Sequence, residues 1–239
     1  MEQVGGQSWS IVIFCFNEVG TVAQIIADAD RVLKEMNIEV AEILVVDDGS
    51  TDGSQAEIKK TVPNFERSTY IFHDKNKGIG HALRTGYFNA NYENICAVPA
   101  DGQFDLNELK PFSSIAANSF ISFFRKENTS YSLFRNILSI FNKTVNQILN
   151  GFNLLDVNWV KIYKREAILA LNLQIESSLV ESEICAKLLK SDFEVKQIQS
   201  KYLERKSGES KGSSFKIVLQ ALKDTLLLSK VLWSFKPIK

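Results

Sequence analysis

The segment Asp47-Asp48-Gly49-Ser50 places two carboxylates directly after an apolar run. Carboxylates at the end of a buried strand are costly unless a ligand or water satisfies them. One interpretation is therefore that Asp48 accepts a hydrogen bond from a nucleobase or a ribose. The other is a plain strand end, with Asp52 or Ser50 capping the helix that follows. The residues alone favour neither interpretation.

A second acidic segment, Asp101-Gly102-Gln103, follows the apolar run that ends at Pro99. Asp101 and Gln103 offer oxygen ligands at alternate positions, which suits Mg²⁺ or Mn²⁺ held partly by the phosphates of a ligand. An Asp-Gly pair is also typical of a simple turn, and the residues alone favour the turn. A metal site here is a hypothesis that depends on the neighbouring motifs.

Two further segments have residues suited to phosphate groups. Gly78 and Gly80 open a predicted helix, where glycine lets the backbone come close to a phosphate or to another element. The polar segment 202–214 carries Arg205 and Lys211, which could close over a diphosphate and neutralise a leaving group. The alternative for that segment is a solvated surface loop.

Apolar runs and helical periodicities alternate along the first half of the chain, which predicts a parallel sheet with crossover helices. Ligands bind at the carboxyl ends of the strands in such sheets, where both acidic segments lie. The predicted strands are residues 10–16, 41–46, 68–73, 95–99, 120–124, 160–163 and, at an edge, 195–198. The predicted helices are residues 21–36 with Thr21 as cap, 51–61, 78–90, 107–117, 131–149, 165–171, 182–191 and a C-terminal helix from 215.

Composition favours one α/β domain, with or without an appendage. The chain has 239 residues, of which 45% are hydrophobic, and its formal net charge is zero. A neutral chain lacks the electrostatic signature of a general nucleic-acid binder. Cys15, Cys96 and Cys185 have no metal-binding spacing, and we expect them to be buried free thiols in a reducing compartment.

The ends of the sequence bear on its location. No basic-then-apolar leader opens it, and no apolar run approaches the about 20 residues that a spanning helix needs. We therefore expect a cytoplasmic protein. The stretch 215–235 mixes a broad apolar surface with lysines, so this amphipathic helix either lies on the inner face of the cell membrane or packs on the core or a partner.

The motifs also occur in a characteristic order. The segments are Phe14-Cys15-Phe16-Asn17-Glu18, Val46-Asp47-Asp48-Gly49-Ser50, Asn76-x-Gly78-x-Gly80-x-Ala82, Asp101-Gly102-Gln103, Arg125, Asp156 with residues 160–167, and Arg205-x-x-Gly208-x-Ser210-Lys211. Together they resemble family 2 glycosyltransferases with the GT-A fold, and most closely the dolichol- or polyprenyl-phosphate mannose and glucose synthases. The resemblance covers about residues 9–212, and its specificity comes from the joint order of the motifs.

The resemblance implies a fold and a set of site residues. Residues 1–212 would form a GT-A-like, Rossmann-type three-layer sandwich with a mostly parallel central sheet, and residues 213–239 the amphipathic helix. Asp101 and Gln103 would hold Mg²⁺ or Mn²⁺ on the diphosphate of a nucleotide-sugar. Phosphate contacts would come from Arg125, Arg205 and Lys211. The nucleoside pocket would be lined by Phe14, Phe16, Glu18, Val46, Asp48 and Ala100.

Three positions depart from the family pattern. Phe14 replaces a proline, and Phe16 replaces a tyrosine, so Phe16 can stack on a base but has no hydroxyl. Pro99 stands where the family has the first aspartate of its metal motif, and proline supplies no side-chain ligand. Metal binding would then depend on Asp101, Gln103, the diphosphate and water. This departure keeps open a non-catalytic or altered homologue that binds a nucleotide-sugar.

The expected activity is inverting transfer of a sugar from a UDP- or GDP-sugar to a polyprenyl-phosphate or a glycan in cell-envelope or polysaccharide synthesis. Asp101 with its metal, Arg205 and Lys211 would stabilise the departing nucleoside diphosphate. A hydroxyl acceptor would also need a base, for which the candidate is Glu183, ahead of Glu181 and Asp105. The alternative for Glu183 is an exposed carboxylate at a helix start.

A sugar nucleotidyltransferase is the other enzyme class with a related α/β layout. Such an enzyme would need a Gly-rich, basic phosphate loop just after the first strand. The segment Asn17-Glu18-Val19-Gly20 is not such a loop, so this class is the weaker alternative.

Overall fold

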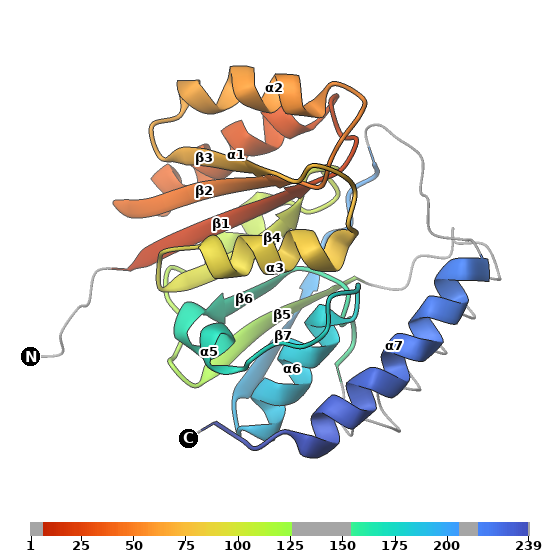
Figure 1. Ribbon diagram of the computed structural model, residues 1–239. Helices are drawn as coiled ribbons and strands as arrows, with labels where there is room; N and C mark the ends of the chain where they lie inside the picture. Colours follow the sequence, from red (N-terminus) through yellow and green to blue (C-terminus); the bar gives the residue numbers. More distant parts are fainter. Residues whose placement is uncertain (1–6, 126–153, 206–214, 239) are drawn as a thin grey trace, which may run out of the picture.

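The computed structural model describes residues 7–125, 154–205 and 215–238, with the side chains of the last segment described from residue 223. These residues form a seven-stranded sheet in the order β3-β2-β1-β4-β6-β5-β7 (Figure 1). The strands are β1 (Ser8–Cys15), β2 (Val40–Asp47), β3 (Ser68–Phe72), β4 (Asn94–Pro99), β5 (Ser119–Arg125), β6 (Lys161–Lys164) and β7 (Glu194–Ser200). The helices are α1 (Val22–Glu35), α2 (Ser54–Thr61), α3 (Ile79–Asn89), α5 (Arg165–Ala170), α6 (Val180–Lys190) and α7 (Phe215–Ser234), with short 3₁₀ turns η1 (Val62–Asn64) and η2 (Leu106–Leu109).

The sheet is mostly parallel, as predicted. β1 pairs in parallel with both β2 and β4, β2 with β3, and β5 with β7. Only β6, among the described strands, runs antiparallel to its neighbours β4 and β5. The chain leaves β1 towards β2 on one side and returns to β4 on the other. The carboxyl ends of β1 and β4 therefore flank the switch point at which parallel α/β sheets bind ligands.

Alternating side chains give the sheet two apolar faces. Ile11 and Ile13 join a core cluster with α1 and α2, whereas Val12 joins a second cluster with α3, α5, α6 and α7. Successive residues of a strand point to opposite faces, so one buried strand feeds both clusters. The result is the expected three-layer sandwich, with helices on both sides of the sheet (Figure 1).

Helix α1 has the predicted periodicity but not the predicted cap. Its apolar residues bury one stripe at helical spacing (Val22, Ile25, Ile26, Ala29, Val32 and Leu33). Thr21 occupies the N-cap position without making a side-chain cap bond. Its hydroxyl instead donates to the Glu18 carbonyl oxygen at 3.3 Å, so the Thr21 capping prediction is wrong.

Two other helix predictions also differ from the structure. Residues 107–117 form only the turn η2 followed by irregular chain, because Pro111 has no N–H to donate and disfavours a helical residue before it. Helix α2 begins at Ser54 rather than at 51, and Asp52 accepts the Ser54 N–H at 2.9 Å. The predicted helix 131–149 lies outside the described residues.

Helix α7 is present as predicted, and its inner face packs on the domain. Leu228, Val231 and Leu232 are buried in the cluster that contains α6, and α7 runs beside α6 in Figure 1. Beyond the helix, the Ile238 N–H donates to the Ser191 hydroxyl at 3.0 Å. None of the helices in the described part of the chain is long and apolar enough to cross a membrane.

Candidate functional site

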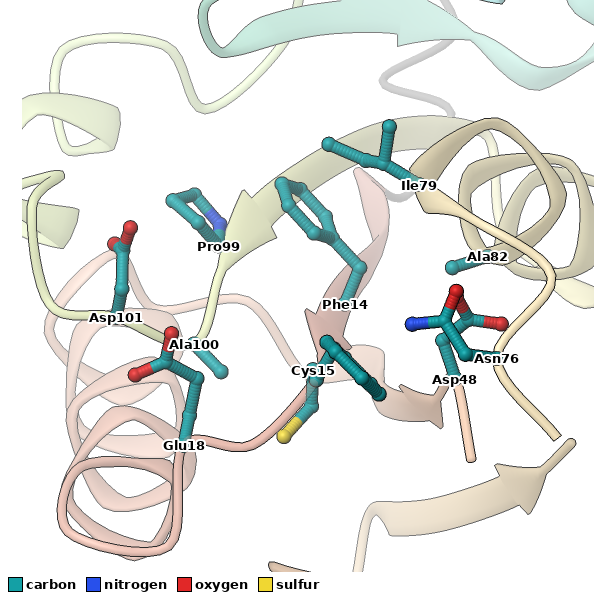
Figure 2. A pocket seen from close by; sticks show the side chains of 11 residues that line it. Phe14, Cys15, Glu18, Asp48, Asn76, Ile79, Ala82, Pro99, Ala100 and Asp101 are labelled. Atoms are coloured by element: carbon teal, nitrogen blue, oxygen red, sulfur yellow. The ribbon is translucent and has the colours of Figure 1, made fainter. Parts of the chain in front are cut away.

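A pocket of about 200 Å³ opens at the carboxyl ends of β1, β2 and β4, beside the start of α3. In Figure 2, Glu18, Ala100 and Asp101 lie on one side of Phe14, and Asp48 and Asn76 lie on the other. The pocket is lined by Phe14, Cys15, Phe16, Glu18, Asp48, Asn76, Ile79, Ala82, Pro99, Ala100 and Asp101. Most of the predicted nucleoside-binding residues therefore meet at one place.

Asp48 holds a loop of its own chain at one wall of the pocket. One carboxylate oxygen contacts His73 Nδ1 at 2.7 Å and accepts the Lys77 N–H at 3.0 Å, and the other accepts the Gly78 N–H at 2.7 Å. His73 also contacts the Thr85 hydroxyl on α3 at 2.9 Å. Asp48 is 2% exposed, so these contacts satisfy the buried carboxylate without any ligand.

Asp47 holds the turn that follows β2. Its carboxylate accepts the Ser50 N–H at 2.9 Å and the Gln55 side-chain N–H at 2.8 Å. Gly49 in this turn has φ +71°, and a Cβ there would come within 2.4 Å of the Lys75 carbonyl carbon. The turn and the loop bound by Asp48 therefore approach each other so closely that only glycine fits.

Gly80, in the first turn of α3, allows two elements to pack closely. A Cβ on Gly80 would lie 2.0 Å from the Ser177 carbonyl oxygen and 2.3 Å from that of Glu176. Of the two predicted uses of this glycine, approach to another element is the one that the structure shows. The contact fixes α3, and with it Ile79 and Ala82, at the rim of the pocket.

The opposite wall joins residues from distant parts of the chain. A β-bridge between Phe104 and Tyr202 and the bond from the Leu203 N–H to the Gln103 carbonyl (3.0 Å) attach residues 202–203 to the chain that leaves β4. Arg205 then reaches Glu18 and forms an ion pair with its Oε1. The long-range bridge thus brings a predicted phosphate-binding cation beside the pocket.

Burial shapes the electrostatics of this wall. It raises the pKa of the Glu18 carboxyl, which Arg205 partly lowers and the charge of Asp101 raises. Burial likewise raises the pKa of Asp101, against the backbone N–H of Gln103 and the charges of Arg205 and Arg125. Burial disfavours the charged forms of Glu18 and Asp101. A cation beside them would stabilise those charged forms, so this wall favours cation binding.

Some of the groups near the predicted metal position suit a divalent ion, and others do not. Pro99 lines the pocket but supplies no ligand atom, and the described residues contain no group of three or more His, Cys, Asp and Glu side chains arranged around a metal position. Gln103 donates its side-chain N–H to the Tyr202 hydroxyl. Glu18 Oε2 is buried without a hydrogen-bond partner among the described residues. A divalent ion that also rests on diphosphate oxygens needs few protein carboxylates, so these residues fit one.

Some predicted site residues lie elsewhere. Val46 is fully buried in the core cluster beside α3, which corrects its assignment to the pocket lining. Arg125 lies at the end of β5, where Asp156 binds its Nε at 2.7 Å and its guanidinium stacks 4.5 Å from the Trp159 ring centre. It does not line the pocket. Lys211 lies outside the described residues.

Glu183 is not an exposed helix-start carboxylate. It is 0% exposed, pairs with Lys187 at 2.7 Å, and accepts the N–H groups of Gln174 and Ile175. Glu181 is buried as well and accepts the hydroxyls of Tyr87 and Tyr163. These carboxylates hold the packing of α6, which corrects their assignment as candidate bases.

Three residues on the Asp48 side of the pocket were not among the predicted site residues. His73 was only the end of a predicted strand, yet it joins Asp48 to α3. Asn76 and Ile79 belong to the Asn-x-Gly-x-Gly motif and line the pocket. The motif signalled them, whereas nothing in the sequence around His73 distinguished it from other strand-end residues.

These strand-end motifs fall inside a recognised family. A family model described as glycosyl transferase family 2 matches residues 10–168, which span β1 to α5. The chain belongs to glycosyl transferase family 2. The family resemblance drawn from the motifs is therefore confirmed.

The chain is also similar to individual proteins of known identity. The dolichyl-phosphate beta-glucosyltransferase of Saccharomyces cerevisiae is 31% identical over 106 residues, which are 42% of this chain and 32% of that protein. The match thus spans about a third of the length of the curated relative. A crystal structure of glucosyl-3-phosphoglycerate synthase from Mycobacterium tuberculosis in complex with UDP has a TM-score of 0.63 at 15% identity, over 94% of this chain and 81% of that one.

A second structure of that synthase, with Mn²⁺, UDP-glucose and phosphoglyceric acid, has a TM-score of 0.65 at 15% identity and covers 94% of this chain and 80% of that one. At this identity the likeness concerns the fold. It confirms that this family 2 chain has the GT-A architecture, with the pocket at the carboxyl ends of its parallel strands.

Proposed function

We propose that this family 2 protein transfers a sugar from a nucleotide-sugar to a polyprenyl-phosphate at a membrane surface. The observation that carries the proposal is the convergence, at one pocket, of the aromatic end of β1, the carboxylates of Glu18, Asp48 and Asp101, and the neighbouring Arg205. A nucleotide-sugar presents a flat base, a ribose and a diphosphate, and needs these three kinds of partner.

The donor side follows from the two walls of the pocket. Phe14 and Phe16 offer aromatic faces on which a base can stack. Asp48 fixes the loop that carries Asn76 at one wall of the pocket. Asp101 and Arg205 lie at the other wall, which is proposed to bind the diphosphate. The synthase of the same fold has been solved with UDP and with UDP-glucose, which supports a UDP-sugar as the first donor to test, ahead of a GDP-sugar.

The proposed reaction is a direct displacement with inversion. An acceptor oxygen forms a bond to the anomeric carbon while the bond from that carbon to the donor diphosphate breaks, and the electron pair leaves with the nucleoside diphosphate. Arg205 neutralises charge on this leaving group. Lys211 is proposed for the same role.

A divalent ion fits the pocket wall and would supply further charge neutralisation on the diphosphate. Asp101 and Gln103 are the residues of the β4 edge that would hold it. The synthase of the same fold binds Mn²⁺, so Mn²⁺ or Mg²⁺ is the ion to supply in assays.

The choice of acceptor depends on whether the protein offers a general base. A hydroxyl acceptor must lose its proton to a positioned base, and Glu183 and Glu181 are occupied by internal partners. The third candidate, Asp105, caps η2 by accepting the backbone and side-chain N–H groups of Asn107. A lipid phosphate is already anionic near neutral pH and needs only positioning. The relative from Saccharomyces cerevisiae is named for dolichyl phosphate, which supports the same choice.

Helix α7 supports a membrane surface as the place of reaction. Its outward face carries Leu226 (70% exposed), Leu227 (46%) and Trp233 (89%). Lys223, Lys230 and Lys236 are exposed beside them. Apolar and aromatic side chains with flanking lysines match the boundary of an anionic bilayer, whereas the inner face of α7 is already covered by the domain.

The donor assignment is tested by binding and transfer. We expect UDP-glucose with Mn²⁺, at about 100 times its Kd, to stabilise the protein by about 2.7 kcal/mol, and to donate glucose to a polyprenyl-phosphate. Asp101→Asn should lose transfer, whereas the exposed Asp74→Asn should keep it. If no nucleotide-sugar in a panel of UDP-, GDP- and dTDP-sugars binds, the proposal fails. Binding without transfer to lipid or glycan acceptors would instead support the nucleotide-sugar-binding homologue.

The membrane assignment is tested by flotation with vesicles that contain anionic phospholipid. We expect the intact chain to float, and the double variant Leu226→Ser/Trp233→Ser to remain in solution with unchanged thermal stability. Val40→Ser/Tyr70→Ser is the matched control, because it removes exposed apolar side chains at the start of β2 and in β3. Equal flotation of both double variants would contradict a role for α7.

A further inference from the structure

The β4 edge is short of one carboxylate for a divalent ion. The metal motif that Asp101 and Gln103 resemble carries an aspartate at the position of Pro99, and this chain has proline there. Since Pro99 lines the same pocket, its ring occupies the place from which a ligand would come. Any further protein ligand for the ion therefore comes from another element.

Glu18 is a carboxylate on that pocket with an unused oxygen. Its side chain is 6% exposed and lines the pocket. Arg205 contacts Oε1 through its guanidinium, while Glu18 Oε2 and Arg205 Nε are both buried with no hydrogen-bond partner among the described residues. A buried carboxylate oxygen without a partner is costly, and binding of a cation would remove that cost.

The backbone of Glu18 is held firmly in this position. Its N–H donates to the Ser54 hydroxyl at 2.9 Å, and its carbonyl accepts the N–H groups of Thr21 and Val22 at 3.1 and 3.0 Å. The side chain thus projects from a fixed turn between β1 and α1. Figure 2 shows its carboxylate on the same side of the pocket as that of Asp101, with Ala100 beside them.

We propose that Glu18 is a ligand of the divalent ion and takes the place of the carboxylate that Pro99 lacks. The proposal rests on the proposed function, since the ion is the one carried with the diphosphate. Glu18 Oε2, Asp101 and the amide oxygen of Gln103 are hard oxygen donors, which Mg²⁺ and Mn²⁺ prefer, and the diphosphate and water supply the rest. The ligands thus come from two strand ends, β1 and β4, instead of from β4 alone.

The test measures Mn²⁺ affinity directly, by electron paramagnetic resonance of free Mn²⁺, with and without UDP. We expect Glu18→Gln to weaken Mn²⁺ binding to the UDP-bound protein by at least about tenfold, since even outer-shell partners of metal sites contribute roughly 10- to 100-fold. Because Glu18 also lines the pocket, its metal-free affinity for UDP should fall as well, but by a smaller factor than its Mn²⁺ affinity. Glu39→Gln, an exposed site before β2, is the matched control and should change neither value.

A rescue variant separates a ligand from a merely structural residue. Restoring the family aspartate in Glu18→Gln/Pro99→Asp should return Mn²⁺ affinity towards that of the unchanged protein. If Glu18→Gln weakens UDP binding equally with and without Mn²⁺, Glu18 contacts the nucleoside and the proposal is overturned. Unchanged Mn²⁺ affinity in Glu18→Gln overturns it too, while UDP binding by the same sample leaves the proposed function standing. If the unchanged protein binds neither UDP nor Mn²⁺, both proposals fall.

Discussion

The oxygens of the Asp48 carboxylate form hydrogen bonds within the protein. Its oxygens are occupied by His73 and by the N–H groups of Lys77 and Gly78. A direct contact with a nucleobase or ribose, which the strand-end motif suggested, would have to share these oxygens. Asp48 therefore acts on the pocket chiefly by holding the loop that carries Asn76.

Replacing Asp48 should harm folding and binding together. Asp48→Ala leaves buried donors without a partner, so we expect a loss of about 1–3 kcal/mol in the free energy of unfolding, measured by urea denaturation. UDP binding should fall as the loop loosens. Asp74→Ala makes the same change at an exposed site of that loop and should stay within about 0.5 kcal/mol. A fully stable Asp48→Ala that fails to bind UDP would contradict the loop-holding role and favour direct contact.

The cysteines should be inert in the folded protein. All are free and buried, as expected from the sequence. Burial raises the pKa of Cys185 to about 11 and that of Cys96 further. A raised pKa lowers the thiolate fraction, so at pH 8 labelling by a disulfide reagent should be at least about 100-fold slower than in urea. Prompt labelling of the native protein would show that these thiols are accessible.

Among the elements, α3 depends most on a single missing side chain. Gly80 lets the first turn of α3 lie against the backbone at Glu176 and Ser177. The same helix carries Thr85, which meets His73, and Ile79 and Ala82 at the pocket. The packing of one turn thus positions much of one pocket wall.

Two glycine substitutions at the start of α3 should destabilise the fold for different reasons. Gly80→Ala places Cβ against backbone that has no room to give, so we expect a loss of about 1–3 kcal/mol or more and weaker UDP binding. Gly78→Ala meets nothing within 4 Å, but its φ of +95° and ψ of 159° lie in a region that is essentially restricted to glycine, at a cost of about 1–3 kcal/mol. Urea denaturation of both variants measures the two losses. A Gly80→Ala variant as stable as the unchanged protein would show that the close approach at Gly80 is not limiting.

For the whole molecule, zero net charge means that any attraction to an anionic bilayer must be local. The exposed lysines of α7 lie beside Leu226, Leu227 and Trp233. Helix α2, with exposed Lys59 and Lys60, belongs to the layer on the other face of the sheet. The molecule therefore offers two lysine pairs on different faces.

Charge reversal on these two faces should have unequal effects. Lys223→Glu/Lys230→Glu should weaken binding to anionic vesicles by roughly tenfold or more, since each lysine near the surface contributes about 1 kcal/mol. Lys59→Glu/Lys60→Glu changes the net charge equally and should leave binding within about twofold, as should neutral vesicles for either variant. Sedimentation of vesicles at 50 and 200 mM salt measures both. Equal losses would mean that overall charge, not α7, governs the attraction.

The sequence by itself determined the order of strands and helices, the mostly parallel sheet and the strand ends at which the site lies. These features depend on local patterns: alternation in strands such as residues 10–16, helical spacing in α1, and polar motifs directly after apolar runs. It failed where one residue overrides a pattern, as Pro111 does in the stretch 107–117. It also named most of the pocket lining, because the motifs follow the strands.

Only the tertiary structure decided which polar atoms are occupied. Glu183 was a candidate base until packing buried it against Lys187, and Asp48, predicted to contact a ligand, also binds His73. Arg205 meets Glu18 across a separation of 187 residues, a pairing that no local spacing encodes. Burial and hydrogen-bond satisfaction are properties of packed neighbours, so the unused oxygen of Glu18 beside Asp101 could appear only once the chain was folded.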